Sequence, residues 1–211
     1  MGGLLQRYAL PPEEIEHQSM RRVSSLCRGA LPSEPSEQAV ALRMVYSVGD
    51  PTIASLVKIS PGAARAGVMA LRAGAPLGVD VRMVGAGLDR KRLESLGCPV
   101  YCALDMVPPD YDPNIPRTAH GMAALSGHMS GGVAVIGTAP TALLALLDAL
   151  DGGAAPPALI IATPPGFIAA TESKQELALR KVPYILVRGT HGGAAMAVAA
   201  VNALLRLALP S

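Results

Sequence analysis

Strand-like and helix-like segments alternate through the second half of this chain, and this alternation limits the possible folds more than any other feature. Three short apolar runs are each followed, after a short connection, by a longer segment of helical composition. Such connections form right-handed crossovers between parallel strands and cover both faces of the sheet. We therefore expect an α/β fold with a doubly wound, mainly parallel sheet. The expected strands lie within 132–137, 158–166 and 183–189, and the helices at 139–150, 167–181 and 192–209.

The first half of the chain carries helix boundary signals. Ser36 is placed to cap a helix, Ser60 and Pro61 to open the next, which Gly74 ends, and Asp89 to cap a short one. The expected helices are 13–27, 37–48, 61–73 and 90–96, and the expected strands are 76–84 and 99–104.

Residues 105–116 hold four prolines and three aspartates, which predicts a surface loop long enough to be suspected of function. The pattern on either side continues one fold, so this loop need not separate domains. A length of 211 residues suits a single domain, 1–211.

Composition excludes several classes of protein. A formal charge of +2, with only 3% aromatic residues, argues against nucleic-acid binding. No apolar run reaches the length of a membrane span, and the first residues lack the pattern of a signal peptide, so we expect a cytoplasmic protein.

The four histidines are widely separated in sequence, and Cys98 and Cys102 lie in an apolar strand-like stretch. We therefore expect buried thiols and no metal site.

Ligands of open parallel sheets bind outside the carboxyl ends of the strands. Those ends are 135–141, 162–167 and 187–193, and all three are rich in glycine, proline and small hydroxyl residues. Glycine permits close approach to the backbone, and a following helix N-terminus offers N–H groups to an anion. We interpret them as a cleft for a ligand with anionic or carbonyl groups. The alternative is that these turns simply need small residues. The dinucleotide fingerprint is incomplete, because Gly85 and Gly87 have no third glycine.

Several separate motifs together resemble one family. VIGTAPTALLALLDAL, PALIIATPPGFIAATESKQEL and VPYILVRGTHGGAAMAVAAVNAL are similar to the C-terminal signature of precorrin-8X methylmutases of cobalamin biosynthesis. IEHQSMRRV, AVALRMVYSVGD, GVMALRAGAPLGVDVRMVGAGL and GCPVYC follow the family's order in the first half. The resemblance covers nearly the whole chain.

The resemblance implies an isomerase with a Rossmann-like fold. The family moves a methyl group from C-11 to C-12 of a ring-contracted tetrapyrrole, precorrin-8X or its cobalt form, and yields hydrogenobyrinate or cobyrinate. It implies no dissociable cofactor. It also implies a homodimer, with the site in a deep cleft near the subunit interface. The corrinoid substrate carries many carboxylates, which suits arginines and helix N-termini.

The catalytic position departs from the family pattern. Where the family has an acid/base histidine thought to protonate a ring nitrogen, this chain has Tyr46. An ordinary tyrosine holds its proton about 3.5 pH units more tightly than a histidine, or roughly 5 kcal/mol at neutral pH. Tyr46 is then a weaker acid, a binding group or a relic. His120 is an alternative source of the missing imidazole.

Other positions follow the resemblance more closely. It implies substrate binding by Ser19, Arg43 and Arg117, whereas the residues alone favour a surface serine and solvated charges. Thr138 replaces a family asparagine and Pro165 a valine, which indicates altered contacts in the cleft. We predict that Thr138 also binds substrate.

Three functions remain open from the sequence. The first, which we favour, is an active methylmutase in which Tyr46 replaces histidine. The second is a carrier that binds corrinoids without converting them. The third is an α/β enzyme of another class that uses the same cleft for a small anion.

Overall fold

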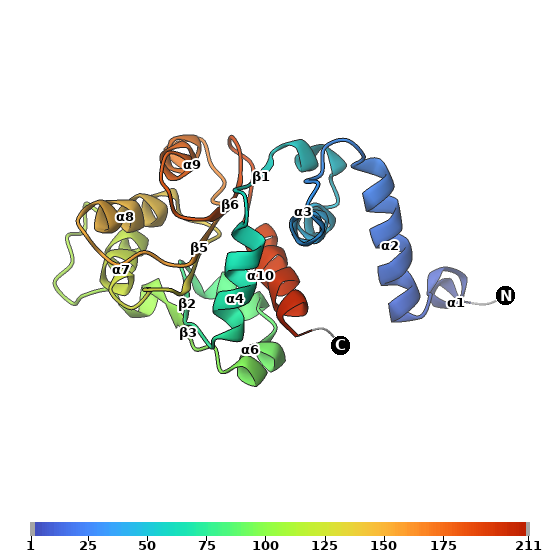
Figure 1. Cartoon of the computed structure of the whole chain (residues 1–211), viewed down its shortest axis with the longest axis horizontal. Coiled ribbons are helices and arrows are strands. Elements are labelled where there is room, and N and C mark those ends of the chain that lie inside the picture. Colours follow the sequence, from blue (N-terminus) through green and yellow to red (C-terminus); the bar gives the residue numbers. More distant parts are fainter. Residues whose placement is uncertain (1–2, 210–211) are drawn as a thin grey trace.

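The computed structural model describes residues 3–209 as an α/β fold built around one sheet (Figure 1). The strands are β1 (Val57–Ile59), β2 (Leu77–Val79), β3 (Val100–Cys102), β4 (Val133–Ile136), β5 (Leu159–Ala162) and β6 (Tyr184–Val187). The α-helices are α1 (Leu4–Tyr8), α2 (Pro12–Leu26), α3 (Pro35–Val48), α4 (Ala63–Arg72), α5 (Arg82–Gly87), α6 (Arg90–Leu96), α7 (Arg117–Ser126), α8 (Pro140–Asp151), α9 (Ala170–Ala178) and α10 (Ala194–Ala208). Two 3-10 turns are η1 (Pro51–Ser55) and η2 (Ala103–Asp105).

The six strands follow the order β1-β6-β5-β4-β2-β3, and every pair is parallel except β1 with β6. The predicted mainly parallel sheet is confirmed. The antiparallel edge strand β1 was not predicted, because three residues between a turn and Ser60 give no readable alternation. It pairs Val57 with Val187 and so brings the end of η1 to the carboxyl end of β6.

Helices cover both faces of the sheet, as expected for a doubly wound fold (Figure 1). Val133 and Val135 of β4 point into a core shared with α3, α4, α5, α6 and α10. Ala134 and Ile136 point into the opposite core, shared with α7 and α8 and closed by Leu177 of α9. Because both faces of β4 are buried, its sequence is continuously apolar.

The strand predicted at 76–84 is wrong beyond Val79. The carboxylate of Asp80 accepts the backbone N–H of Val81 and those of residues 137–139 in the next strand's loop, and α5 begins at Arg82. A local sequence pattern does not predict this strand end, because the hydrogen-bond partners of Asp80 in the loop lie 57 or more residues away in the sequence.

Helix boundaries show smaller corrections. Glu34, not Ser36, caps α3: its carboxylate accepts the N–H of Glu37 at 2.8 Å, and Ser36 lies inside the helix. Helix α9 begins at Ala170 rather than 167, and α1 and α7 were not predicted.

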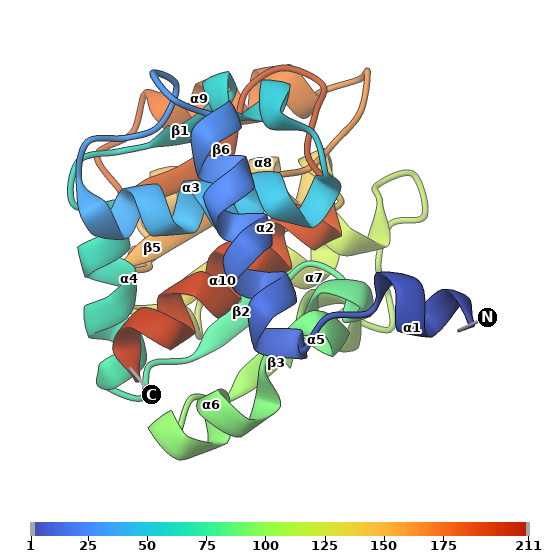
Figure 2. The ribbon, with the colours of Figure 1, turned by 90° about the vertical axis from the view of Figure 1, so that its right-hand side faces the viewer.

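The N-terminal helices lie on the outside of the fold. Neither α1 nor α2 contains a buried residue, and α2 packs against α3. Figure 2 shows α2 crossing in front of α3 and α10. No helix within residues 3–209 is long and apolar enough to span a membrane.

Candidate active site

Tyr46 lies in the last turn of α3, which Gly49 ends in the left-handed conformation with φ of 68°. Its side chain borders a hollow of about 240 Å³ between α2 and α3. Ser19 of α2 borders the same hollow, so the structure brings these two predicted residues together. The remaining lining residues are Arg22, Val23, Leu26, Val45, Gly49 and Pro51.

The packing of α3 explains why Tyr46 faces this hollow. Val40, Ala41, Met44 and Val45 form the buried stripe of the helix. Tyr46 lies one residue beyond that stripe, at the side that α2 covers, and is 41% exposed. The site therefore offers a phenol and a serine hydroxyl over a floor that is mostly aliphatic.

Arg43, predicted to bind substrate, is engaged within the protein. Its guanidinium forms an ion pair with Glu16 of α2, and Arg206 of α10 donates to the same carboxylate oxygen at 2.6 Å. The hydrogen bond from Arg43 lowers the pKa of Glu16 most, and Arg206 adds to it. This cluster fixes α2 against α3 and α10, and so sets the position of Ser19 relative to Tyr46.

The carboxyl ends of β4, β5 and β6 lie side by side, as predicted. In the loop that leads into α8, three backbone N–H groups are already engaged within the protein. Asp80 accepts the N–H groups of Gly137, Thr138 and Ala139 at 3.1, 2.8 and 2.9 Å. The Thr138 side chain is exposed beside this internal carboxylate.

Asp80 is fully buried, and sequence reasoning missed it. Burial raises its pKa, while the backbone N–H donors act in the opposite direction. A lone aspartate inside the apolar stretch 77–84 was the available signal.

Lys174 was also missed as a site residue. It is 2% exposed, and its ammonium donates to the carbonyl oxygens of Pro164 and His191, both at 3.0 Å. Burial lowers its pKa to about 8. Its helical spacing from Ala170 and Leu177, both buried, could have revealed it.

Arg117 and His120 lie away from Tyr46. Both belong to α7, on the opposite face of the sheet from α3. Arg117 is exposed at the helix start, and the Nε2 atom of His120 lies 3.0 Å from the carbonyl oxygen of Asp112. The imidazole that lies near the end of α3 is instead that of His191. The pKa of Asp50, just beyond α3, is lowered mainly by its hydrogen bond from Thr52, and the charge of His191 contributes a smaller lowering.

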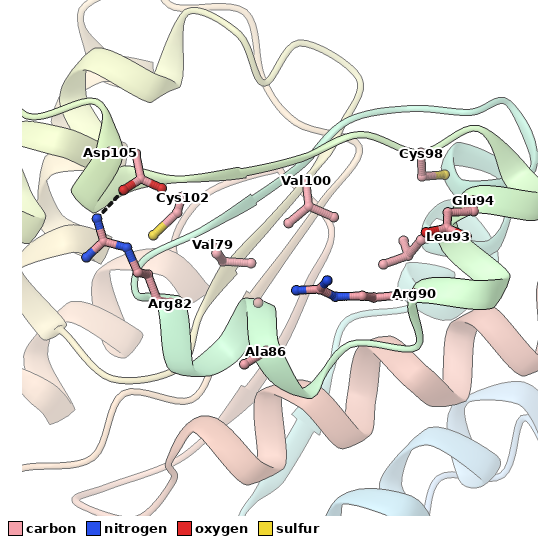
Figure 3. Close-up of a pocket in the computed structure, with 11 residues that line it drawn as sticks. Val79, Arg82, Ala86, Arg90, Leu93, Glu94, Cys98, Val100, Cys102 and Asp105 are labelled. Atoms are coloured by element: carbon pink, nitrogen blue, oxygen red, sulfur yellow. Dashed lines mark hydrogen bonds and ion pairs between the residues drawn. The ribbon is translucent and has the colours of Figure 1, made fainter.

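A larger hollow of about 540 Å³ lies at the other end of the sheet, beside β2 and β3 (Figure 3). Arg82 pairs with Asp105 at one side, and Arg90 extends across it toward Val79 and Val100. It contains none of the predicted site residues.

The prediction of buried thiols is confirmed for two of the three cysteines. Cys27 and Cys98 are buried, Cys102 is half-buried, and all three are free thiols whose pKa burial raises. Within the described part of the chain, no three potential metal ligands of the His, Cys, Asp and Glu types form a cluster.

The doubly wound sheet, with glycine-rich loops gathered at the carboxyl ends of β4 to β6, defines an α/β protein of the ligand-binding class. Comparison with known proteins narrows that class. The chain belongs to the precorrin-8X methylmutase family, whose model matches residues 14–207. It is therefore an enzyme of a methyl-transferring isomerase family of cobalamin biosynthesis.

Individual relatives agree. The chain is 44% identical over 178 residues to a precorrin-8X methylmutase of Pseudomonas aeruginosa, covering 79% of this chain and 82% of the relative. It is 33% identical over 200 residues to a cobalt-precorrin-8 methylmutase of Priestia megaterium, covering 93% and 88%. The crystal structure of precorrin-8X methylmutase from Thermus thermophilus superposes with a TM-score of 0.82 at 36% identity, covering 92% of this chain and 96% of that one.

Proposed function

We propose that this protein moves the methyl group of precorrin-8X, or of its cobalt form, from C-11 to C-12, with Tyr46 at the reacting ring. The observation that carries the proposal is the shared hollow of Tyr46 and Ser19 at the C-terminal end of α3. A phenol hydrogen-bonded to a ring nitrogen withdraws electron density from the ring and weakens the bond to the migrating methyl. Binding geometry supplies the rest of the rate enhancement.

The remaining predicted residues have roles at the periphery of the substrate. Ser19 donates or accepts a hydrogen bond beside Tyr46, while Arg117 and Thr138 bind carboxylates of the macrocycle. Arg43 acts from its ion pair with Glu16, where it can turn one N–H toward substrate and still hold α2. The reaction uses no dissociable cofactor, and we place it in the cytoplasm.

A homodimer explains two features of this site. Pockets that enclose a drug-sized ligand are about 300–1,000 Å³, so a hollow of about 240 Å³ holds only part of a tetrapyrrole. Arg117 lies on the other face of the sheet from Tyr46 within one chain. A second copy would complete the cleft and bring its α7 toward Tyr46. Light scattering should give twice the 21.6 kDa chain mass, and a monomer would contradict this.

The test of function is turnover of precorrin-8X and cobalt-precorrin-8 by purified protein, followed by the visible spectrum. Wild-type conversion that falls at least about tenfold in Tyr46→Phe would establish Tyr46 as a working acid or hydrogen-bond donor. Tyr101→Phe is the matched control, because Tyr101 is 42% exposed on β3 and distant from the hollow.

The same assay separates an enzyme from a carrier. Tight binding of both substrate and product without conversion, with activity appearing in Tyr46→His, would make the protein a corrinoid carrier. Weak binding of both would favour another small anionic ligand. His120→Ala tests the alternative imidazole: unchanged turnover and an unchanged pH profile would exclude it.

A further inference from the structure

The loops that follow β5 and β6, residues 163–169 and 188–193, are bonded to each other at the carboxyl edge of the sheet. We refer to them as the paired loops. The backbone N–H of Gly193 donates to the carbonyl oxygen of Thr163 at 2.6 Å, and the Thr163 hydroxyl donates to the Gly193 carbonyl at 3.0 Å. The N–H of Gly166 donates to the carbonyl oxygen of Thr190 at 3.0 Å. The two loops therefore behave as one unit.

Their close approach depends on glycine. Gly192 has φ of 148°, and a Cβ atom at this position would lie 2.1 Å from the carbonyl oxygen of Thr163. Ala169, with φ of 59°, is the only non-glycine residue with positive φ among residues 3–209. A backbone held in such a conformation indicates that the surrounding structure fixes it.

Lys174 of α9 also connects the two loops, through hydrogen bonds from its buried ammonium group. Its Nζ atom donates to Pro164 in one loop and His191 in the other, both at 3.0 Å. Within the described chain its hydrogen bonds go to these two carbonyls, and a buried ammonium without a bonded carboxylate is costly. An apolar side chain would fill this helix position at no such cost, which indicates a role other than packing.

Two apolar side chains of the paired loops are exposed to solvent. Phe167, the only phenylalanine in the chain, is 93% exposed, and Ile168 is 88% exposed. The hydrogen bonds described above hold the loops that carry these exposed side chains. The faces of a tetrapyrrole are apolar and its rim is charged, so the two groups match a macrocycle face rather than its carboxylates.

We propose that Lys174 is a positioning residue that locks the paired loops so that Phe167 is held against the face of the tetrapyrrole. This inference rests on the proposed function. It adds a specificity element at the ends of β5 and β6 to the Tyr46 hollow. Lys174 itself does not touch the reacting atoms.

The first test compares hydrogen exchange in wild type and Lys174→Met, which keeps the length and volume of the side chain without its charge. We expect the amides of 163–169 and 188–193 to exchange at least about tenfold faster, with β4 and β5 unchanged. Lys181→Met, at an exposed lysine beyond α9, is the control. Unchanged exchange in the paired loops would refute the claim that Lys174 holds them together.

The second test measures kcat and KM separately. Lys174→Met should lower kcat/KM by about 10- to 100-fold, mainly through KM, as expected when a binding group is misplaced by an ångström or so. Phe167→Ala should raise KM similarly while leaving exchange in the rest of the paired loops as in wild type. Faster exchange with wild-type kcat/KM would overturn the positioning role.

The third test is chemical rescue. Lys174→Ala removes the equivalent of propylammonium, so added propylamine should restore part of kcat/KM, whereas propanol at the same concentration should not. Folding of this variant is checked by circular dichroism, and failure of rescue in a folded variant counts against the tie. If wild type neither converts nor binds either substrate, the proposed function and the positioning role both fall. If wild type converts the substrate and the Lys174 variants convert it equally well, the positioning role is refuted and the proposed function stands.

Discussion

Arg43 of α3 and Glu16 of α2 form an ion pair that sets how the two helices cross beside the Tyr46 hollow. Arg43→Met should cost about 1 kcal/mol of stability, because the pair is partly exposed. It should also lower kcat/KM, since Ser19 is no longer held opposite Tyr46. Urea unfolding and steady-state kinetics measure the two effects.

Arg206→Met is the matched comparison, because Arg206 donates to the same Glu16 oxygen from α10. Its effect on kcat/KM should be smaller than that of Arg43→Met, and equal effects would contradict the role given to α3. The lowered pKa of Glu16 also determines how this ion pair's contribution to the free energy of unfolding depends on pH. The contribution is fully present above the ordinary carboxyl pKa and is lost as the pH falls through the pKa of Glu16 in the folded protein.

Asp80→Asn should destabilise the fold by about 1–3 kcal/mol. The carboxylate accepts four backbone N–H groups, from Val81 and residues 137–139, whereas an amide offers one oxygen and turns an NH₂ toward other donors. Urea midpoints measure the loss. Asp110→Asn, at an exposed loop position, should be neutral, and an Asp80 variant as stable as that control would refute this account.

Gly121→Ala should disrupt the packing of α7. The new Cβ atom would lie 1.9 Å from the carbonyl oxygen of Ala103, so the helix must move away from η2. We expect a loss of about 3 kcal/mol or more, or no soluble protein. Gly127→Ala, at the end of the same helix, meets nothing within 4 Å and has φ of −63°, so it should be neutral or slightly stabilising.

Lys174 predicts a particular dependence of stability on pH. Its folded pKa, about 8, lies below the ordinary value of 10.5, so the unfolded chain binds more protons between these values. The free energy of unfolding therefore rises across that window because of this group, by about 3 kcal/mol at most. The difference in free energy of unfolding between wild type and Lys174→Met should therefore shift in favour of wild type between about pH 8 and 10.5, measured by urea titration. A constant difference would show that Lys174 does not titrate there.

Much of the fold could be predicted from the sequence because it follows from local patterns. The strands β4, β5 and β6 are continuously apolar and joined by short connections, so their order along the chain implies their parallel pairing. The expected strand at 76–84 failed where Asp80 bonds to a loop 57 residues away. The edge strand β1 is defined only by its partner β6.

The site was less accessible than the fold. Ser19 and Tyr46 were found together because the resemblance identified both positions. The ion pair of Arg43 with Glu16 depends on how two helices cross, which no local pattern encodes. Lys174 was missed because lysine is ordinarily exposed, and only its position on the buried stripe of α9 separates it from a surface charge.

The antiparallel pairing of β1 with β6 has a consequence for how the chain acquires its structure during synthesis. Two early elements pack on the two last elements: β1 lies beside β6, and α3 lies along α10. In a nascent chain, the part of the apolar stripe of α3 that packs on α10 therefore stays uncovered until α10 has left the ribosome. The α7–α8 layer and the parallel strands β2 to β5 can associate earlier, so closure of α3 onto α10 is expected to be the last step.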